Sequence, residues 1–222
     1  QPNIAKPLGV HHLLSTIIGQ SLYNIFKASA FDTIGINLIG DWGTQFGKLI
    51  CAYKKWGSKE MVERNPIDEL LKLYVKFHEE AEKETALEDE ARKEFKSFED
   101  GDEENRKLWQ WFVDESLKEI QKTYDLLGGI HFDHIQGESF YEDKMGAILE
   151  DGKKKKIFEV GEEGAYVINY EDPNIPTVPI QKKDGATLYM TRDFAALKYR
   201  LDSWKPLKIL YVVDTAQSLH FK

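Results

Sequence analysis

The chain has one cysteine among its 222 residues and no apolar run approaching the length of a membrane span. A lone cysteine excludes an internal disulfide and any metal site built from several cysteines, which fits a reducing compartment. A helix needs about 20 apolar residues to cross a bilayer, so we expect no membrane partner. The first residues also have neither the basic start nor the apolar core of a signal peptide. We therefore expect a cytoplasmic protein, with Cys51 as an inert thiol on the apolar face of a helix.

Positive net charge is lacking as well. The formal net charge is −8 at pH 7, which argues against a protein that coats nucleic acid nonspecifically. It leaves room for a local basic surface that meets RNA at one place. The chain is 41% hydrophobic and 31% charged, so we expect a folded protein rather than a disordered one.

Hydrophobic periodicity predicts a mixed α/β fold with an open parallel sheet. The charge-dense stretch 79–102 is different, because only a thin apolar line runs through it. We interpret residues 57–107 as an all-helical insertion. We expect helices at 12–28, 44–56, from 65 onward, 103–127 and 188–201, strands at 33–39, 130–132 and 208–213, and a hairpin formed by 155–160 and 164–170.

The stretch from Asn37 to Gly47 carries the strongest local signal. A short apolar run ends in a turn that contains Gly40, Gly43 and Gly47, with Trp42 and Phe46 between them. A generic turn from strand to helix needs one glycine and no tryptophan. The pattern therefore indicates a backbone pressed closely against another group.

A loop rich in proline and glycine leads to two adjacent histidines, His11 and His12, at the start of the first expected helix. A helix N-terminus offers unpaired N–H groups and the positive end of the helix dipole, which suits phosphate. Imidazole at that position can donate to phosphate oxygens. The alternative is a pair of ordinary loop histidines.

Tyr189 and Asp193 lie four residues apart on an expected helix and so share a face. A phenol beside a carboxylate is a plausible receptor for a planar cation, because a carboxylate accepts guanidinium hydrogen bonds in pairs. The alternative is a surface pair in which Asp193 bonds Arg192 or Lys198.

Two further polar groups follow expected strands. Glu138 comes after one strand, and Gln217 follows the apolar run 209–213. Open α/β sheets bind ligands at the carboxyl ends of their strands. Glu138 taken alone also fits a solvated turn, and Gln217 is suited to bond an amino group or a ribose.

Together these segments resemble the arginyl-tRNA synthetase family of class I aminoacyl-tRNA synthetases. The family patterns S-P-N-I-A-K-P, G-D-W-G-T-Q-F-G, D-G-A-x-L-Y-x-T-R-D and Y-V-V-x-x-x-Q-x-L-H-F correspond to residues 2–7, 40–47, 184–193 and 211–221. The resemblance extends along essentially the whole chain and is least specific between 57 and 107.

The resemblance implies a Rossmann nucleotide-binding fold, incomplete here, with a helical and an α+β insertion. The catalytic domain would comprise 1–56, 108–137 and 186–222, interrupted by the helical insertion 57–107 and by the insertion 138–185 with its hairpin. The implied reaction joins arginine to ATP, accompanied by Mg²⁺, and passes the arginyl group to tRNA(Arg). Arginine would bind Asn3, Glu138, Tyr189, Asp193 and Gln217, ATP would bind Gly9, His12 and Thr16, and His12 and His11 would be the catalytic pair.

The family signature is altered in its central residues. Its first histidine is Gly9 here and its glycine is His11, so His11 is a candidate shifted replacement. An alternative from another class is a catalytically silent relative that binds arginine or tRNA as a sensor or scaffold. The chain also stops before the family's second nucleotide loop, and we expect it to be a fragment of a longer enzyme, inactive by itself and monomeric.

Overall fold

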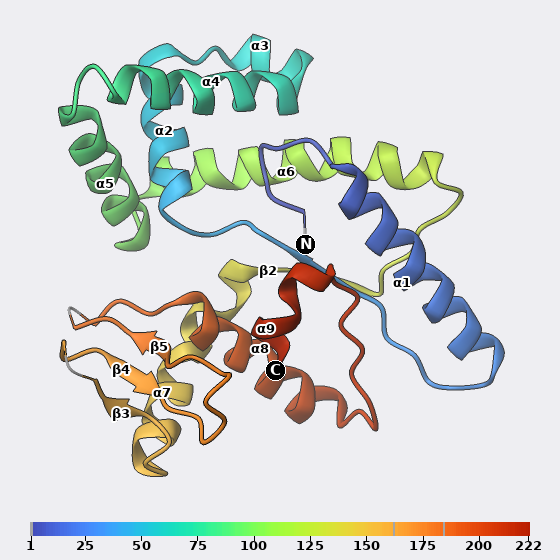
Figure 1. Cartoon of the computed structure of the whole chain (residues 1–222). Coiled ribbons are helices and arrows are strands. Elements are labelled where there is room, and N and C mark those ends of the chain that lie inside the picture. The colour runs from blue at the N-terminus through green and yellow to red at the C-terminus, as the bar shows by residue number, and fades with distance from the viewer. Residues whose placement is uncertain (1, 162, 184) are drawn as a thin grey trace. The chain divides into compact units, whose positions relative to one another are not determined.

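The computed structural model describes residues 2–161, 163–183 and 185–222. The chain forms two compact units, Gln1–Gly137 and Glu138–Lys222. In the described part of the chain, no helix is long and apolar enough to span a membrane. The first unit contains α1 (Val10–Ala28), β1 (Ile36–Ile39), α2 (Thr44–Trp56), α3 (Lys59–Arg64), α4 (Pro66–Ala81), α5 (Ala86–Glu99), α6 (Glu103–Leu126) and β2 (His134–Gly137) (Figure 1).

The first unit contains a short parallel sheet. β1 and β2 pair in parallel, with Ile36 opposite His134 and Ile39 opposite Gly137. Beyond β1, Asn3 forms a parallel bridge with Gly40. The expected strand at 33–39 is thus confirmed in its second half, and the parallel arrangement is confirmed for this pair.

The strand expected at 130–132 is wrong, because the structure begins β2 at His134. Gly128 and Gly129 both have φ of 90°, a left-handed conformation that leads the chain out of α6. The Asp133 carboxylate then accepts from the Gly35 N–H at 2.7 Å, and pairing with β1 starts at the next residue. Residues 134–137 are less apolar than residues 130–132, but they form the strand because their backbone pairs with that of β1.

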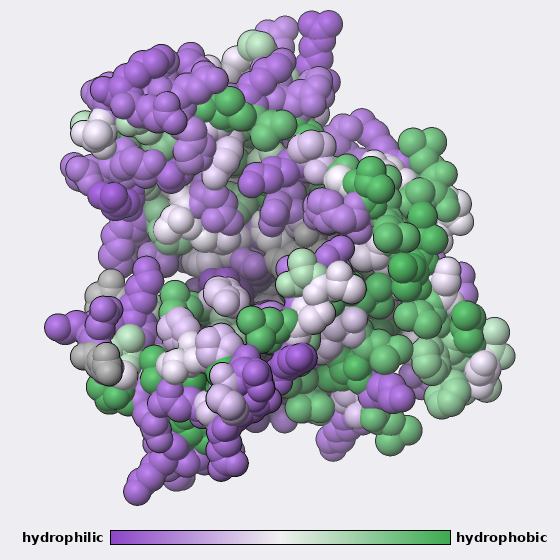
Figure 2. All heavy atoms as spheres, viewed as in Figure 1, coloured by the Kyte–Doolittle hydropathy of each residue, from purple (hydrophilic) through white to green (hydrophobic). Residues whose placement is uncertain are grey.

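Helix α1 begins two residues before the expected start and contains no fully buried residue. Its apolar side chains include Ile17 and Ile25, which are exposed. Figure 2 shows apolar side chains gathered over this helix. The exposed apolar residues of α1 are Val10, Leu14, Ile17, Ile18 and Ile25.

The helices of the expected insertion are all present, and they share one core with α2 and α6. Asn65 precedes Pro66 at the start of α4, as the sequence predicts. Helices α2 and α5 lie so close that a Cβ on Gly47 would stand 2.3 Å from the carbonyl oxygen of Ala91. Along this contact, lysines of α2 pair with glutamates of α5: Lys48 with Glu88, Lys54 with Glu94 and Lys55 with Glu90.

The second unit is built from helices around a three-stranded antiparallel sheet. Its elements are η1 (Glu138–Lys144), α7 (Met145–Lys154), β3 (Glu159–Val160), β4 (Tyr166–Ile168), β5 (Val178–Gln181), α8 (Tyr189–Trp204), η2 (Thr215–Gln217) and α9 (Ser218–Phe221). The sheet order is β3-β4-β5. The predicted hairpin is confirmed as β3 and β4, although both strands are shorter than expected; Glu162 in its turn lies outside the described residues.

The strand expected at 208–213 is wrong. Residues 205–214 form no strand, and Leu210, Tyr211 and Val213 are exposed. An extended segment gains ladder hydrogen bonds only beside a neighbouring strand, and the structure pairs this segment with none. The apolar run has the composition of a buried strand without the partner that would bury it.

Candidate functional site

The carboxyl ends of β1 and β2 meet in the first unit. Gly40 lies beside Asn3, because the Ile4 N–H donates to the Gly40 carbonyl at 3.2 Å and the Gly40 N–H donates to the Pro2 carbonyl at 2.8 Å. The carboxylate of Asp41 fills the space where Gly137 lacks a side chain: a Cβ there would stand 1.9 Å from Asp41 Oδ2. This is the edge at which open α/β sheets bind ligands.

The three glycines between residues 40 and 47 have different roles in the structure. Gly40 bridges Asn3, Gly43 has φ of 123° as the N-cap of α2, and Gly47 allows α5 to approach α2. Trp42 packs against Phe95, Phe98 and Trp109, at centroid distances of 6.2, 4.7 and 6.3 Å. The predicted close approach is therefore confirmed, and its partner at Gly47 is the backbone of α5.

The two histidines begin α1, as expected. Gly9 is the N-cap, and its N–H donates to His12 Nδ1 at 3.0 Å. Because Nδ1 accepts, the proton of a neutral His12 ring is on Nε2, which leaves that nitrogen as a donor. The ring of His11 lies 3.9 Å from the ring of His12, and His11 is exposed. Thr16 lies one helical turn further on in α1, and elsewhere in this unit the hydroxyl of Tyr124 accepts from Asn37 Nδ2 at 3.2 Å.

In the second unit, Glu138 already holds a guanidinium of the chain itself. Arg192 Nη1 donates to Glu138 Oε2 at 3.2 Å, while its Nη2 and Nε donate to Glu142 Oε1 at 2.9 and 3.1 Å. The Arg192 side chain is 14% exposed, so this ion pair is shielded on most sides. Two carboxylates around one guanidinium form a planar, charge-assisted arrangement.

Asp193, the next residue, has a different partner. Its Oδ2 lies 2.8 Å from His220 Nε2. The ring of Tyr189 lies 5.5 Å from the ring of His220, so Tyr189 and Asp193 do share a face of α8, as predicted. Neither alternative partner of Asp193 is found, since Arg192 bonds Glu138 and Glu142 and Lys198 bonds Asp202.

Burial raises the pKa of Asp193 above its ordinary value, although His220, Arg192 and Arg200 act in the opposite direction. Burial penalises the charged form of a carboxyl group, so this carboxylate gains from an added cation. Arg192 bonds Glu138, and its positive charge also opposes the rise in the pKa of Asp193. Gln217 ends η2 and is exposed.

Sequence reasoning missed Arg192, Glu142 and His220 as members of this cluster. The sequence did contain a signal for Arg192, because this arginine lies between Tyr189 and Asp193, the two residues predicted to bind an arginine side chain. A guanidinium at that position is suited to form an ion pair within the chain. Nothing in the local sequence links Glu142 or His220 to α8, because both contacts are tertiary.

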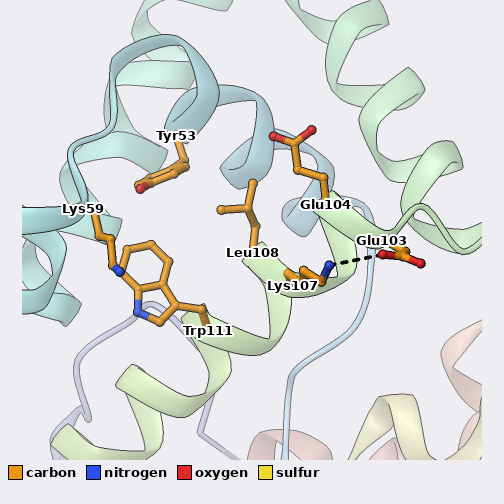
Figure 3. A pocket seen from close by; sticks show the side chains of 7 residues that line it. All are labelled: Tyr53, Lys59, Glu103, Glu104, Lys107, Leu108 and Trp111. Carbon is orange, nitrogen blue, oxygen red and sulfur yellow. Dashed lines mark hydrogen bonds and ion pairs between the residues drawn. The ribbon is translucent and has the colours of Figure 1, made fainter.

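A separate hollow of about 510 Å³ lies on the first unit, lined by Tyr53, Lys59, Glu103, Glu104, Lys107, Leu108 and Trp111 (Figure 3). Lys107 pairs with Glu103 across its rim at 3.1 Å. None of the predicted site residues lines it. Cys51 is buried on α2, in agreement with its expected place on an apolar helical face, and burial raises the pKa of its thiol to about 11; the inertness of the thiol stays a prediction.

Comparison with known proteins bears on both units. The model of the family "tRNA synthetases class I (R), catalytic domain" matches residues 1–222. The chain belongs to this family. It is 55% identical over 221 residues to the arginine–tRNA ligase of Exiguobacterium sp., covering all of this chain and 39% of that protein. It is 53% identical over 220 residues to the arginine–tRNA ligase of Alkaliphilus metalliredigens, covering 99% of this chain and 38% of the relative.

Solved structures of arginyl-tRNA synthetases also match this chain. The arginyl-tRNA synthetase of Plasmodium falciparum matches with a TM-score of 0.84 at 30% identity, covering all of this chain and 37% of that one. The Thermus thermophilus arginyl-tRNA synthetase matches with a TM-score of 0.64 at 18% identity, covering 90% and 35%, and supports the fold alone. The chain thus spans well under half the length of these relatives.

Proposed function

We propose that the protein, in the length its gene encodes, is an arginine–tRNA ligase. The arginine carboxylate attacks the α-phosphorus of ATP, an acyl–phosphate bond forms, and pyrophosphate leaves. A hydroxyl of the terminal ribose of tRNA(Arg) then attacks the carbonyl carbon, an ester forms, and AMP leaves. The curated relatives carry this activity in their names.

The arginine half of the proposal rests on the second unit. One observation carries it: Glu138 accepts an N–H from the guanidinium of Arg192, and Asp193 lies 2.8 Å from the imidazole Nε2 of His220, so both carboxylates have planar nitrogen groups of the chain as partners. Carboxylates arranged for planar cations suit a guanidinium better than an ammonium. We propose Glu138, Asp193 and Tyr189 for the guanidinium, with Asn3 and Gln217 for the remaining polar groups of arginine.

Such a site rejects lysine. An ammonium is a point charge that leaves acceptors of a planar site unpaired, at about 1–3 kcal/mol for each buried acceptor. We expect discrimination of at least about 30-fold from two such acceptors.

The ATP half rests on the first unit. We propose that Gly9, His12 and Thr16 contact ATP, and that His12 donates from Nε2 to a phosphate oxygen while His11 replaces the altered histidine of the family signature. Their support is the position of His12 at the N-terminus of α1 and its Nδ1 bond to Gly9. Catalysis would then consist of positioning and charge neutralisation.

Mg²⁺ enters this proposal with ATP. Among the described residues, no group of three or more histidine, cysteine, aspartate or glutamate side chains is placed to hold a metal. The ion is therefore proposed as a counterion of the phosphates, and no residue of the chain is assigned to it. We further propose a monomer acting in the cytoplasm, with the Rossmann segments, helical insertion and second insertion divided as the sequence predicts.

A pyrophosphate-exchange assay tests the proposal. The gene-length protein is given arginine, ATP, Mg²⁺ and tRNA(Arg), and exchange is compared with that of a His12→Ala variant. Arginine-dependent exchange at least tenfold above the variant supports the ligase. Arginine binding by calorimetry without exchange supports the second candidate, a silent sensor or scaffold, which the altered Gly9–His12 loop favours.

A further inference from the structure

We propose that His220 is a built-in competitor for the arginine site: its imidazole occupies Asp193 and is released when the substrate guanidinium binds. This inference rests on the proposed function, and it adds a residue that sets the affinity for arginine. The observation behind it is the direct contact of His220 with both Asp193 and Tyr189.

The geometry of the contact resembles the one proposed for the substrate. His220 Nε2 lies 2.8 Å from Asp193 Oδ2, and the two rings of His220 and Tyr189 are 5.5 Å apart with an angle of 40° between their planes. A guanidinium grips a carboxylate best by bonding both oxygens at once. A carboxylate oxygen can accept two hydrogen bonds, but the imidazole beside Oδ2 and against Tyr189 occupies space that a guanidinium bonded to both oxygens would need, so His220 competes for the same position.

His220 is less exposed than its neighbours along the chain. Within the described stretch 213–222, every other side chain is exposed, whereas that of His220 is 20% exposed. Leu219 and Phe221 on either side are 53% and 44% exposed. The partial burial of the imidazole agrees with its position against Asp193 and Tyr189 of α8.

The charged groups around Asp193 and His220 are compatible with replacement of His220 by the guanidinium of the substrate. The ionisable groups on the faces packed against the pair are Tyr189, Asp193, Arg192 and Arg200 of α8, and Tyr211, whose hydroxyl accepts from Arg200 Nη1 at 3.2 Å. Burial disfavours ionised Asp193, so the carboxylate favours a cationic partner. Without substrate the imidazole of His220 occupies Asp193, and with substrate a permanently charged guanidinium takes its place.

Competition of this kind multiplies the apparent dissociation constant of arginine by the reciprocal of the fraction of molecules in which Asp193 is unoccupied. Removing the competitor lowers this dissociation constant.

The experiment is the KM for arginine and for ATP in pyrophosphate exchange, measured with the gene-length protein and its variants. His220→Ala is expected to lower the KM for arginine about threefold or more and to leave the KM for ATP unchanged. His220→Arg supplies a tethered guanidinium and is expected to raise the KM for arginine. The matched control is His131→Ala, because His131 also pairs with an aspartate, Asp133, at 3.3 Å and lies outside the proposed site.

A rise in the KM for arginine in His220→Ala would overturn the inference, since it would make His220 a binding group, and an unchanged KM would overturn it as well. If His220→Ala does not fold, His220→Arg decides the matter, because it keeps a planar cation on Asp193; an unaltered KM there contradicts competition. Absence of exchange in the wild type would instead refute the proposed function.

Discussion

The indole Nε1 of Trp109 donates to the backbone carbonyl of Asp41 at 2.6 Å. The bond ties helix α6 to the turn that follows β1. We predict that Trp109→Phe, which keeps an aromatic ring and removes the donor, lowers the free energy of unfolding by about 1–3 kcal/mol, because a partly buried carbonyl loses its partner. Urea denaturation measures this. Trp111→Phe is the control, since Trp111 lines the surface hollow, and an equal loss there would contradict the role given to Trp109.

Two glycines inside helices are expected to respond oppositely to alanine. A Cβ at Gly47 would stand 2.3 Å from the Ala91 carbonyl oxygen and 2.6 Å from Phe95 Cβ, so Gly47→Ala forces α2 and α5 apart. A Cβ at Gly146 in α7 meets nothing within 4 Å. We predict a loss of about 1–3 kcal/mol for Gly47→Ala and a gain of up to about 1 kcal/mol for Gly146→Ala. Thermal melts of both variants are the measurement, and a stabilising Gly47→Ala would refute the described packing.

Cys51 is expected to resist alkylation in the folded protein. Burial, together with nearby Glu90, raises the pKa of its thiol to about 11, so at pH 8 only about one thiol in a thousand is ionised. We predict that iodoacetamide labels Cys51 slowly at pH 8 and quickly in urea. Mass spectrometry follows the reaction, and rapid labelling without urea would show the thiol to be reactive after all.

Local patterns predicted much of the fold. Helices that begin or end with strong signals, such as Pro66 of α4 and Gly57 after α2, lie where the sequence places them. The errors concern strands. Residues 208–213 have the composition of a buried strand and residues 134–137 do not, yet only the latter pair with a neighbour. Strand formation depends on a partner that a single sequence does not reveal.

The candidate site was predictable in its residue types and incompletely so in its contacts. Helical spacing placed Tyr189 and Asp193 on one face, which the shared contact with His220 bears out. The internal partners Arg192 and His220 were not predicted, because ion pairs across 27 to 54 residues follow from tertiary packing. Whether the named residues bind arginine and ATP stays a prediction.

The most direct test of the account is an Asp193→Asn variant of the gene-length protein, assayed for arginine and ATP binding and for thermal stability. Because burial raises the pKa of Asp193 in the folded state, its ionisation removes stability as the pH rises through that pKa. Asparagine avoids this cost, so the melting temperature at pH 7 should not fall. We predict that the dissociation constant for arginine rises about 10- to 100-fold while that for ATP is unchanged. Equal losses for both ligands, or a lower melting temperature, would make Asp193 a structural residue and contradict the account.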